Sequence, residues 1–354
     1  MHCEEIPQYN RGRQAFESPQ TQACIKDMLN AADFVVVTTK YLKEYYNKKY
    51  GVPIENIIAI PNFLPRWWFG DRYDIEQSVN LRNRFKNKPR IGIVSSLSHY
   101  NVDKVRTTKD GKAVRLKKGE DDKPVEPNVW IDQDGNEVKF EDTEYVKDDV
   151  DTILDVIKKT VDVVQWVFFG YCPPTLDEYV KNRKIEVHQG VAILNYPQAL
   201  KHLCLQAILA PLNDGEFNYC KSPIKYMECC ALGIPLLAKK CHPYITCMDD
   251  NWMYADNNEL LEKIHKLRNM SNGIYRKTIE KNWQWLNSKH IDGDFMVNNY
   301  WLEDNMQIWL DLFRLRQKFL HISFKSFANQ YEAKLQKAEE KPIFKGEDGV
   351  EILR

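Results

Sequence analysis

The sequence contains no apolar stretch that approaches the roughly 18 residues needed to span a bilayer. Its first 16 residues, MHCEEIPQYNRGRQAF, are polar and have no apolar core, which excludes a secretory signal peptide. The nine cysteines form no Cys-x-x-Cys pair and several lie inside apolar runs, which favours reduced thiols over a disulfide scaffold. These absences predict a soluble, cytoplasmic protein without a transmembrane segment.

An excess of charge of either sign is also absent. The 354 residues include 50 basic and 50 acidic side chains, so no global field attracts nucleic acid or an anionic membrane. Hydrophobic residues make up 43% of the chain and aromatic residues 12%, which is sufficient for well-packed cores. The length allows two ordinary domains or one elaborate domain.

Short β-branched runs alternate with helical segments along much of the chain. Residues 33–39 and 57–60 are predicted strands on either side of a helix that ends at Gly51. This βαβ order implies a parallel sheet, and it restarts at residues 91–96 after a charged link. Further strands are expected at residues 164–170, 185–191, 206–212 and 236–238. The sequence therefore predicts an α/β protein built from two doubly wound units.

Residues 101–147 interrupt this order. Asp110-Gly111 and Asp134-Gly135 each lie between alternating residues, a strong signal for a β-hairpin. We predict a pair of polar hairpins inserted at the surface, either as solvated decoration or as an arm that grips an acceptor or a partner. The nearby Asp132 belongs to one of these predicted turns and is not assigned to a metal motif.

Two aromatic-rich regions are expected to contribute packing. The cluster PRWWFGDRY at residues 65–73 is predicted to pack at a domain hinge, the alternative being stacking on an acceptor sugar or base. Residues 258–335 are predicted to form helices, and the charged tail at residues 336–354 is predicted to be mobile.

The stretch FNYCKSPIKYMECCALGIPLLA, residues 217–238, places charged side chains in an otherwise apolar setting. Lys221-Ser222-Pro223 opens a predicted helix, and helix N-termini offer backbone N–H groups to phosphate. Lys225 and Glu228 follow at successive helical turns on a similar face. Two lysines suit a diphosphate and a carboxylate can accept both hydroxyls of a ribose. The alternative for Lys225 and Glu228 is an exposed ion pair.

His99 follows a predicted strand at the carboxyl edge of a parallel sheet, where ligands bind in such folds. It is either a surface histidine or a group that hydrogen-bonds a sugar or a phosphate. No second histidine or carboxylate stands at ligand spacing, so His99 is not assigned to a metal.

These stretches resemble the carboxyl-terminal, donor-binding half of GT-B glycosyltransferases, in particular glycosyltransferase family 4 with its bacterial and phage-type relatives. The most specific of them is APLNDGEFNYCKSPIKYMECCALGIPLLAKKCHPY, which is similar to the donor-binding signature. The others are residues 32–63, RIGIVSSLSHYN at residues 90–101 and VFFGYCPP at residues 167–174. Two departures concern the site, because Cys220 stands where many relatives have a glutamate and Ser95 where the phosphate loop has a glycine.

The resemblance implies a nucleotide-sugar donor, such as a UDP- or GDP-sugar, as substrate, with no cofactor and no metal. It implies a catalytic role for His99. The residues it implies for contacts with the donor are Ser96, Ser98, Asn218, Lys221, Ser222, Lys225 and Glu228.

The resemblance also implies a domain order. Residues 1–75 correspond to a partial acceptor-side Rossmann-like domain, 76–257 to the donor-binding domain with its insertion, and 258–335 to helices that brace the first domain. Only about 60 residues precede the crossover between the domains. We therefore expect the first domain to be incomplete, and a second polypeptide or a second copy of the chain to complete it.

The function predicted is that of a retaining, metal-independent, hexosyltransferase-like enzyme, or of its donor-binding subunit, with the acceptor left open. One alternative is a non-catalytic GT-B-like subunit that binds nucleotide or serves as a scaffold. Another is a phage-type glycosyltransferase that modifies nucleic acid. The latter needs a basic face, for which KVRTTKDGKAVRLKK at residues 104–118 is the candidate, and it is not favoured.

Overall fold

The computed structural model describes residues 18–70, 74–95, 99–102, 104–108, 112–119, 129–132, 135–213 and 215–318. The chain divides into two compact units, each made of several segments. Unit 1 comprises residues 1–23, 78–219 and 236–272, and unit 2 comprises residues 24–77, 220–235 and 273–354. This division assigns residues 220–235 to unit 2, whereas the predicted donor domain includes them; the predicted domain boundaries stay a prediction.

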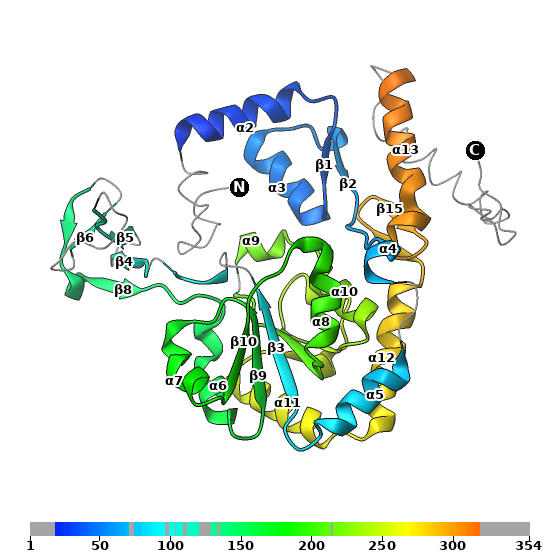
Figure 1. Cartoon of the computed structure of the whole chain (residues 1–354). Coiled ribbons are helices and arrows are strands. Elements are labelled where there is room, and N and C mark those ends of the chain that lie inside the picture. Colours follow the sequence, from blue (N-terminus) through cyan, green and yellow to red (C-terminus); the bar gives the residue numbers. More distant parts are fainter. Residues whose placement is uncertain are drawn as a thin grey trace, which may run out of the picture. The chain divides into compact units, whose positions relative to one another are not determined.

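Unit 1 contains a six-stranded sheet in which every neighbouring pair of strands is parallel. Its strands are β3 (Arg90–Ser95), β9 (Gln165–Gly170), β10 (Ile185–His188), β11 (Ala207–Ala210), β12 (Leu236–Lys239) and β13 (Met253–Tyr254). The spatial order β10-β9-β3-β11-β12-β13 is 3-2-1-4-5-6 when the strands are counted along the chain (Figure 1). This is the order of a doubly wound Rossmann sheet. The predicted α/β class, with one complete Rossmann-like sheet, is confirmed.

The central strands β3, β9, β11 and β12 are mainly apolar runs, as expected where both faces of a parallel sheet are covered. All four residues of β11 are buried, and Trp166 and Phe168 of β9 are inaccessible to solvent. The helices that lie wholly or largely in unit 1 are α5 (Ile75–Arg84), α6 (Leu154–Thr160), α7 (Asp177–Lys181), α8 (Tyr196–His202), α9 (Glu216–Tyr219) and α11 (Asn257–Asn269). The buried guanidinium of Arg82 on α5 donates to the carbonyl oxygens of Leu267 and Met270, which ties α5 to the end of α11.

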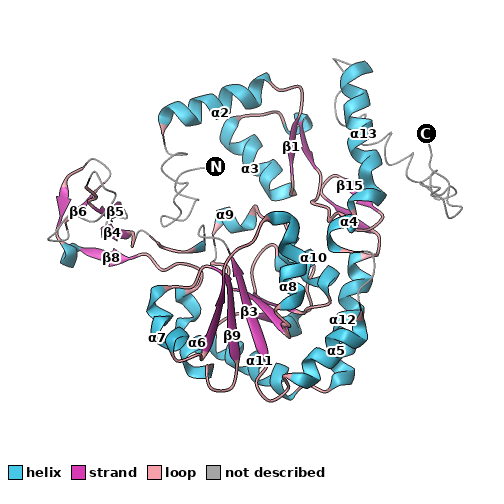
Figure 2. Cartoon of the chain, viewed as in Figure 1, coloured by secondary structure: helices cyan, strands magenta, loops and turns pink. Residues whose placement is uncertain are grey.

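The insertion forms a separate antiparallel sheet within unit 1, away from the parallel sheet (Figure 2). Its strands are β4 (Arg106–Thr108), β5 (Ala113–Leu116), β6 (Trp130–Ile131), β7 (Glu137–Val138) and β8 (Thr143–Tyr145), in the order β7-β6-β5-β4-β8. The pairs β4–β5 and β6–β7 correspond to the two predicted hairpins. The guanidinium of Arg106 lies 4.0 Å from the ring centre of Phe140 and 5.6 Å from that of Trp130, so it packs against both rings.

Unit 2 contains the predicted strand–helix–strand segment. Strands β1 (Val35–Val37) and β2 (Ile57–Ala59) pair in parallel, and α3 (Lys40–Tyr50) connects them. The hydroxyl of Thr39 caps the start of α3, and Gly51 ends it in the left-handed conformation with φ of 71°. The preceding helix, α2 (Pro19–Ala31), crosses the boundary between the units.

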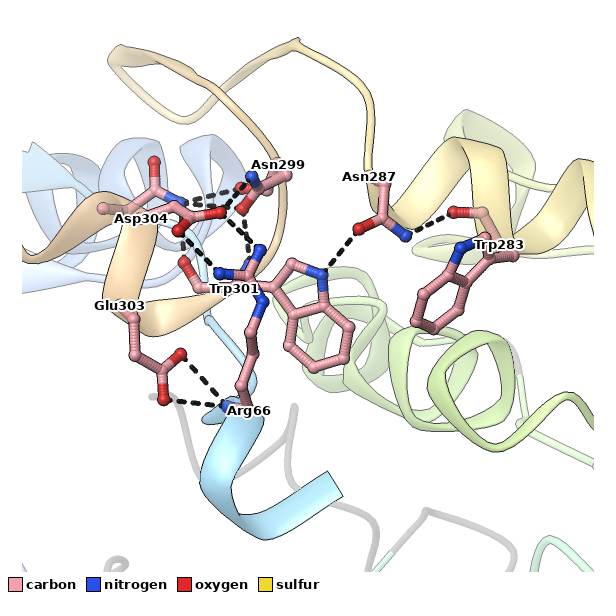
Figure 3. A network of polar contacts seen from close by, with 8 residues as sticks. Arg66, Trp283, Asn287, Asn299, Trp301, Glu303 and Asp304 are labelled. Atoms are coloured by element: carbon pink, nitrogen blue, oxygen red, sulfur yellow. Dashed lines mark hydrogen bonds and ion pairs between the residues drawn. The ribbon is translucent and has the colours of Figure 1, made fainter. Parts of the chain in front are cut away.

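The remaining elements of unit 2 are α4 (Arg66–Phe69), α10 (Ile224–Leu232), most of α12 (Asn272–Leu286), β14 (His290–Asp292), β15 (Phe295–Val297) and α13 (Leu302–Lys318). A polar network joins α4 to α13 (Figure 3). The guanidinium of Arg66 contacts both carboxylate oxygens of Asp304 at 2.7 and 2.5 Å, and its backbone N–H donates to Glu303. Trp301 donates its indole N–H to Asn287. Within the aromatic cluster at residues 65–73, Phe69 is buried and Trp67 is 71% exposed, and residues 71–73 lie outside the described ranges. Packing of this cluster at a domain hinge stays a prediction.

The expectation of helices throughout residues 258–335 is wrong at residues 290–297, where β14 and β15 form an antiparallel hairpin. Gly293 makes its turn with φ of 60°, and a Cβ atom there would lie 2.2 Å from the carbonyl oxygen of Ala59. Asp294 accepts hydrogen bonds from the backbone N–H of Ala59 and from Lys43. The hairpin therefore packs directly on β2. None of the helices in the described ranges has the length and apolar character needed to cross a bilayer.

Candidate functional site

The strand order of unit 1 reverses direction between β3 and β11, which lie side by side at the centre of the sheet. In doubly wound sheets, ligands bind outside the carboxyl ends of the strands at this switch point. The segment after β3 carries His99, and the segment after β11 carries Asn213 and Asn218. The switch point therefore has polar side chains on both of its segments.

A buried carboxylate joins these two segments. Nδ1 of His99 lies 2.8 Å from Oδ2 of Asp149, whose side chain is 3% exposed whereas that of His99 is 30% exposed. The other oxygen of Asp149 accepts the backbone N–H of Asn213 at 2.9 Å. The backbone carbonyl of Asn213 in turn accepts a hydrogen bond of 2.6 Å from the side-chain amide of Asn218. The structure thus brings two predicted site residues, His99 and Asn218, into one hydrogen-bonded chain.

The buried polar atoms of unit 1 without a hydrogen-bond partner among the described residues include Oδ1 of Asn218 and the hydroxyl of Tyr254. Burial raises the pKa of Tyr254, and the nearby charge of Asp149 acts in the same direction. Because buried polar groups are almost always paired, these two atoms are suited to hydrogen-bond a ligand or an ordered water.

Asp148 has a different environment from its neighbour Asp149. Its carboxylate accepts the backbone N–H groups of Asn101, Val150 and Asp151, each at 2.8 Å. Burial raises the pKa of Asp148 to about 6, although these donors lower it. The side chain of Asn101 donates to the carbonyl oxygens of Val105 and Val146, the two ends of the inserted arm. Asp148 therefore stabilises the base of the arm.

The ends of β3 and β9 lie very close together. Gly170 has φ of 110°, and a Cβ atom there would lie 2.4 Å from the carbonyl oxygen of Ser95. The buried hydroxyl of Tyr100 contacts Oγ of Ser95 at 2.7 Å and donates to the carbonyl of Tyr171, and burial raises its pKa. These contacts shape the start of the segment that carries His99. The predicted site residues Ser96 and Ser98 lie outside the described ranges.

The second group of predicted site residues belongs to unit 2, at the start of α10. Tyr226 and Met227 of this helix are buried, whereas Lys225 and Glu228 stay partly exposed and form an ion pair of 3.0 Å. Gly233 ends the helix in the left-handed conformation, with φ of 65°. This ion pair corresponds to the alternative to donor binding that the sequence offers for Lys225 and Glu228. Their contacts with a donor stay a prediction.

The turn before α10 is held by the strand ends of unit 2. The side-chain amide of Asn62 donates to Oγ of Ser222 at 2.5 Å, and the hydroxyl of Thr39 donates to the carbonyl of Cys220 at 3.0 Å. Cys220 itself is buried. In the described part of the chain, no cluster of three or more His, Cys, Asp or Glu side chains could hold a metal ion.

Asp149, Asn213 and Tyr254 are not among the site residues predicted from the sequence. Asp149 is 50 positions from the histidine it contacts, and the whole inserted arm separates them. Its sequence signal is weak, because it stands in a run of acidic residues between the arm and a helix. Asn213 has a clearer sequence signal, because it follows a central strand and therefore lies at the carboxyl edge of the sheet.

No protein-family model and no curated protein matches this sequence. Among solved structures, HepE of Anabaena in complex with UDP and glucose is 14% identical, with 84% of this chain and 68% of that chain covered and a TM-score of 0.48. A glycosyltransferase from Rickettsia africae is 13% identical, with coverages of 83% and 67% and a TM-score of 0.44. WaaG, a glycosyltransferase involved in lipopolysaccharide biosynthesis, is 12% identical, with coverages of 77% and 64% and a TM-score of 0.45. The chain spans about two-thirds of the length of these proteins. Similarity at this level assigns no activity to the chain.

Proposed function

We propose that this chain binds a nucleotide-sugar and acts as a glycosyltransferase, or as the donor-binding subunit of one. The observation that supports this most is the polar constellation at the switch point of the parallel sheet in unit 1. There His99 and Asn218 belong to one hydrogen-bonded chain, and a buried oxygen of Asn218 has no partner among the described residues. A sugar with several hydroxyl groups can hydrogen-bond such donors and acceptors.

The residues of α10 are proposed to bind the nucleotide diphosphate. Lys225 stands in the first turn of this nine-residue helix, and the first N–H groups of a helix have no intrahelical partners. Lysine ammonium groups and such N–H groups together stabilise the charge of a leaving diphosphate without a metal. Lys221 and Ser222 are assigned to the same phosphates, and Glu228 to the ribose hydroxyls, on the strength of the sequence resemblance.

We further propose that transfer retains the anomeric configuration of the donor and needs no divalent cation. Nuclear magnetic resonance of the first product formed identifies its anomer, and turnover in the presence of EDTA tests the need for a metal. Inversion, or a complete loss of turnover in EDTA that Mg²⁺ or Mn²⁺ restores, would contradict this part of the proposal alone.

The decisive experiment measures binding and donor turnover by the full chain. Calorimetric titration with UDP, GDP and CDP is expected to show saturable binding of at least one nucleotide. Release of nucleoside diphosphate from the corresponding sugar donors is expected to follow, with Asn218→Ala weakening it and Glu262→Ala, a change at an exposed position of α11, leaving it intact. Binding without any turnover, with and without candidate acceptors and partner chains, would favour the non-catalytic alternative. The absence of both would overturn the proposal.

A further inference from the structure

We propose that Asp149 is a positioning residue that holds His99 with Nδ1 protonated and presents Nε2 as an acceptor to a hydroxyl group of the bound sugar. The identity of the ligand rests on the proposed function, whereas the state of the imidazole does not. Nothing in the sequence pairs these two residues, and their juxtaposition comes from the way the inserted arm closes on itself.

The tautomer follows from the chemistry of the two groups. A carboxylate has acceptor oxygens and no hydrogen to donate, so the 2.8 Å contact requires the hydrogen to be on Nδ1 of His99. In the neutral imidazole, Nε2 then carries a lone pair. Among the described residues no hydrogen bond to Nε2 is found, and the side chain of His99 remains 30% exposed. The nitrogen is thus available to a ligand hydroxyl.

The geometry also makes Asp149 rigid. One carboxylate oxygen accepts from His99 and the other accepts the backbone N–H of Asn213 at 2.9 Å, so both ends of the group are held. With its side chain 3% exposed, Asp149 has little room to adopt another rotamer. Asp149 therefore links the two segments at the switch point: it fixes the orientation of His99, on the segment after β3, relative to Asn213, on the segment after β11.

Asp148 provides a matched control one residue away. It is also a buried aspartate, but its oxygens accept backbone N–H groups at the base of the arm and it makes no contact with His99 among the hydrogen bonds described. An isosteric Asp→Asn change at either position removes one buried carboxylate. Only the change at position 149 should alter the imidazole.

The test uses the full chain labelled with 15N-histidine. Two-bond 1H–15N correlations report which ring nitrogen carries the proton, and the signals of His99 are identified by their loss in His99→Gln. We expect the Nδ1–H tautomer in the wild type and in Asp148→Asn, and a shift toward the Nε2–H tautomer in Asp149→Asn. The Nε2–H tautomer in the wild type would overturn the proposal, and this measurement does not depend on whether any variant folds. An unchanged spectrum of His99 in a folded Asp149→Asn would also overturn it.

Turnover separates this inference from the proposed function. With a nucleotide-sugar that is a substrate, Asp149→Asn is expected to lower kcat roughly tenfold, as for the loss of about one hydrogen bond to the sugar in the transition state, with KM for the donor changed less than about threefold. Equal kcat values in the wild type and in Asp149→Asn would overturn the positioning role. The expected tautomers without binding or turnover of any nucleotide-sugar would leave the positioning of His99 standing and overturn the proposed function.

Discussion

The switch point of unit 1 and the start of α10 in unit 2 are both candidate ligand-binding regions, but they are built in different ways. At the switch point, contacts join residues far apart in the chain, such as His99 with Asp149, 50 positions away. On α10, the main contact joins Lys225 and Glu228, three positions apart. The first region is organised by tertiary structure and the second by the geometry of one helix.

This difference has an energetic side. The carboxylate of Asp149 and the amide of Asn218 are buried, and removal of one partner of a buried hydrogen bond costs about 1–3 kcal/mol. The Lys225–Glu228 pair is partly exposed, and pairs of this kind contribute at most about 1 kcal/mol to stability. Substitutions in the first region should therefore lower the stability of the fold. Substitutions in the second region should lower ligand affinity, with little effect on stability.

The largest effect is expected from Gly170→Ala, which disturbs the first region alone. The new Cβ would lie 2.4 Å from the carbonyl oxygen of Ser95, at a φ of 110° that disfavours alanine. We expect the free energy of unfolding to fall by about 3 kcal/mol, as for strained backbone with a forced shift. The measurement is denaturant unfolding of both variants, with Gly190→Ala as control.

Gly190 is a suitable control because a Cβ atom there meets nothing within 4 Å and its φ is not positive. It follows β10 at the same edge of the sheet. Its replacement should change stability by less than about 0.5 kcal/mol. Equal losses in the two variants would mean that the close approach of β3 and β9 does not constrain this edge.

The next effect concerns pH and Asp148, the buried aspartate at the base of the arm. Because burial raises the pKa of Asp148 to about 6, the folded state binds its proton more tightly than the unfolded state does. This group therefore favours folding most at low pH, and its contribution is lost as the pH rises from about 4 through about 6. We expect a loss on the order of 2 kcal/mol across that window, measured as the stability of the wild type relative to Asp148→Asn. Parallel stability curves for the two proteins would show that the proton of Asp148 is not linked to folding.

Most of the fold could be predicted from the sequence, because its signals are local. The buried strands of unit 1 are apolar runs, and Gly51 and Gly233 end helices as expected from their conformational freedom. The strand order could not be predicted from such patterns, since it depends on which apolar runs pair. The hairpin at residues 290–297 is not among the predicted elements, although Asp292-Gly293 carries the same turn signal as the arm, because the long helical segments on both sides dominate the pattern there.

The candidate site divides in the same way. Lys225 and Glu228 could be placed on one helical face from their spacing, and the structure bears out that they are neighbours. Asp149 could not be found, because its role depends on the arm bringing position 149 back beside position 99. No local pattern encodes a contact of this kind.

A smaller effect is expected from Glu228→Ala, which tests the second region. Loss of hydrogen bonds from a carboxylate to ribose should lower nucleotide affinity at least roughly tenfold, or about 1.4 kcal/mol, because hydrogen bonds to charged groups are the stronger ones. The melting temperature should change little, since the ion pair with Lys225 is partly exposed. Titration calorimetry with nucleoside diphosphate gives the affinity, and Glu262→Ala on α11 is the control. An unchanged affinity would leave Glu228 as a surface partner of Lys225 only.

The smallest effect is expected from Lys225→Ala, which distinguishes phosphate binding from a purely structural ion pair. Lys225 contacts Glu228 in the structure, so a bound diphosphate must share or replace that partner, and the net gain is smaller than for a lysine held ready for phosphate. We expect the affinity for nucleoside diphosphate to fall roughly fivefold, about 1 kcal/mol, while the affinity for the nucleoside without phosphates stays the same. Lys221→Ala should act in the same direction, and Lys277→Ala, an exposed position of α12, should have no effect. If Lys225→Ala weakens both ligands equally, its role is to support Glu228 at the ribose, and the diphosphate must be bound by other groups.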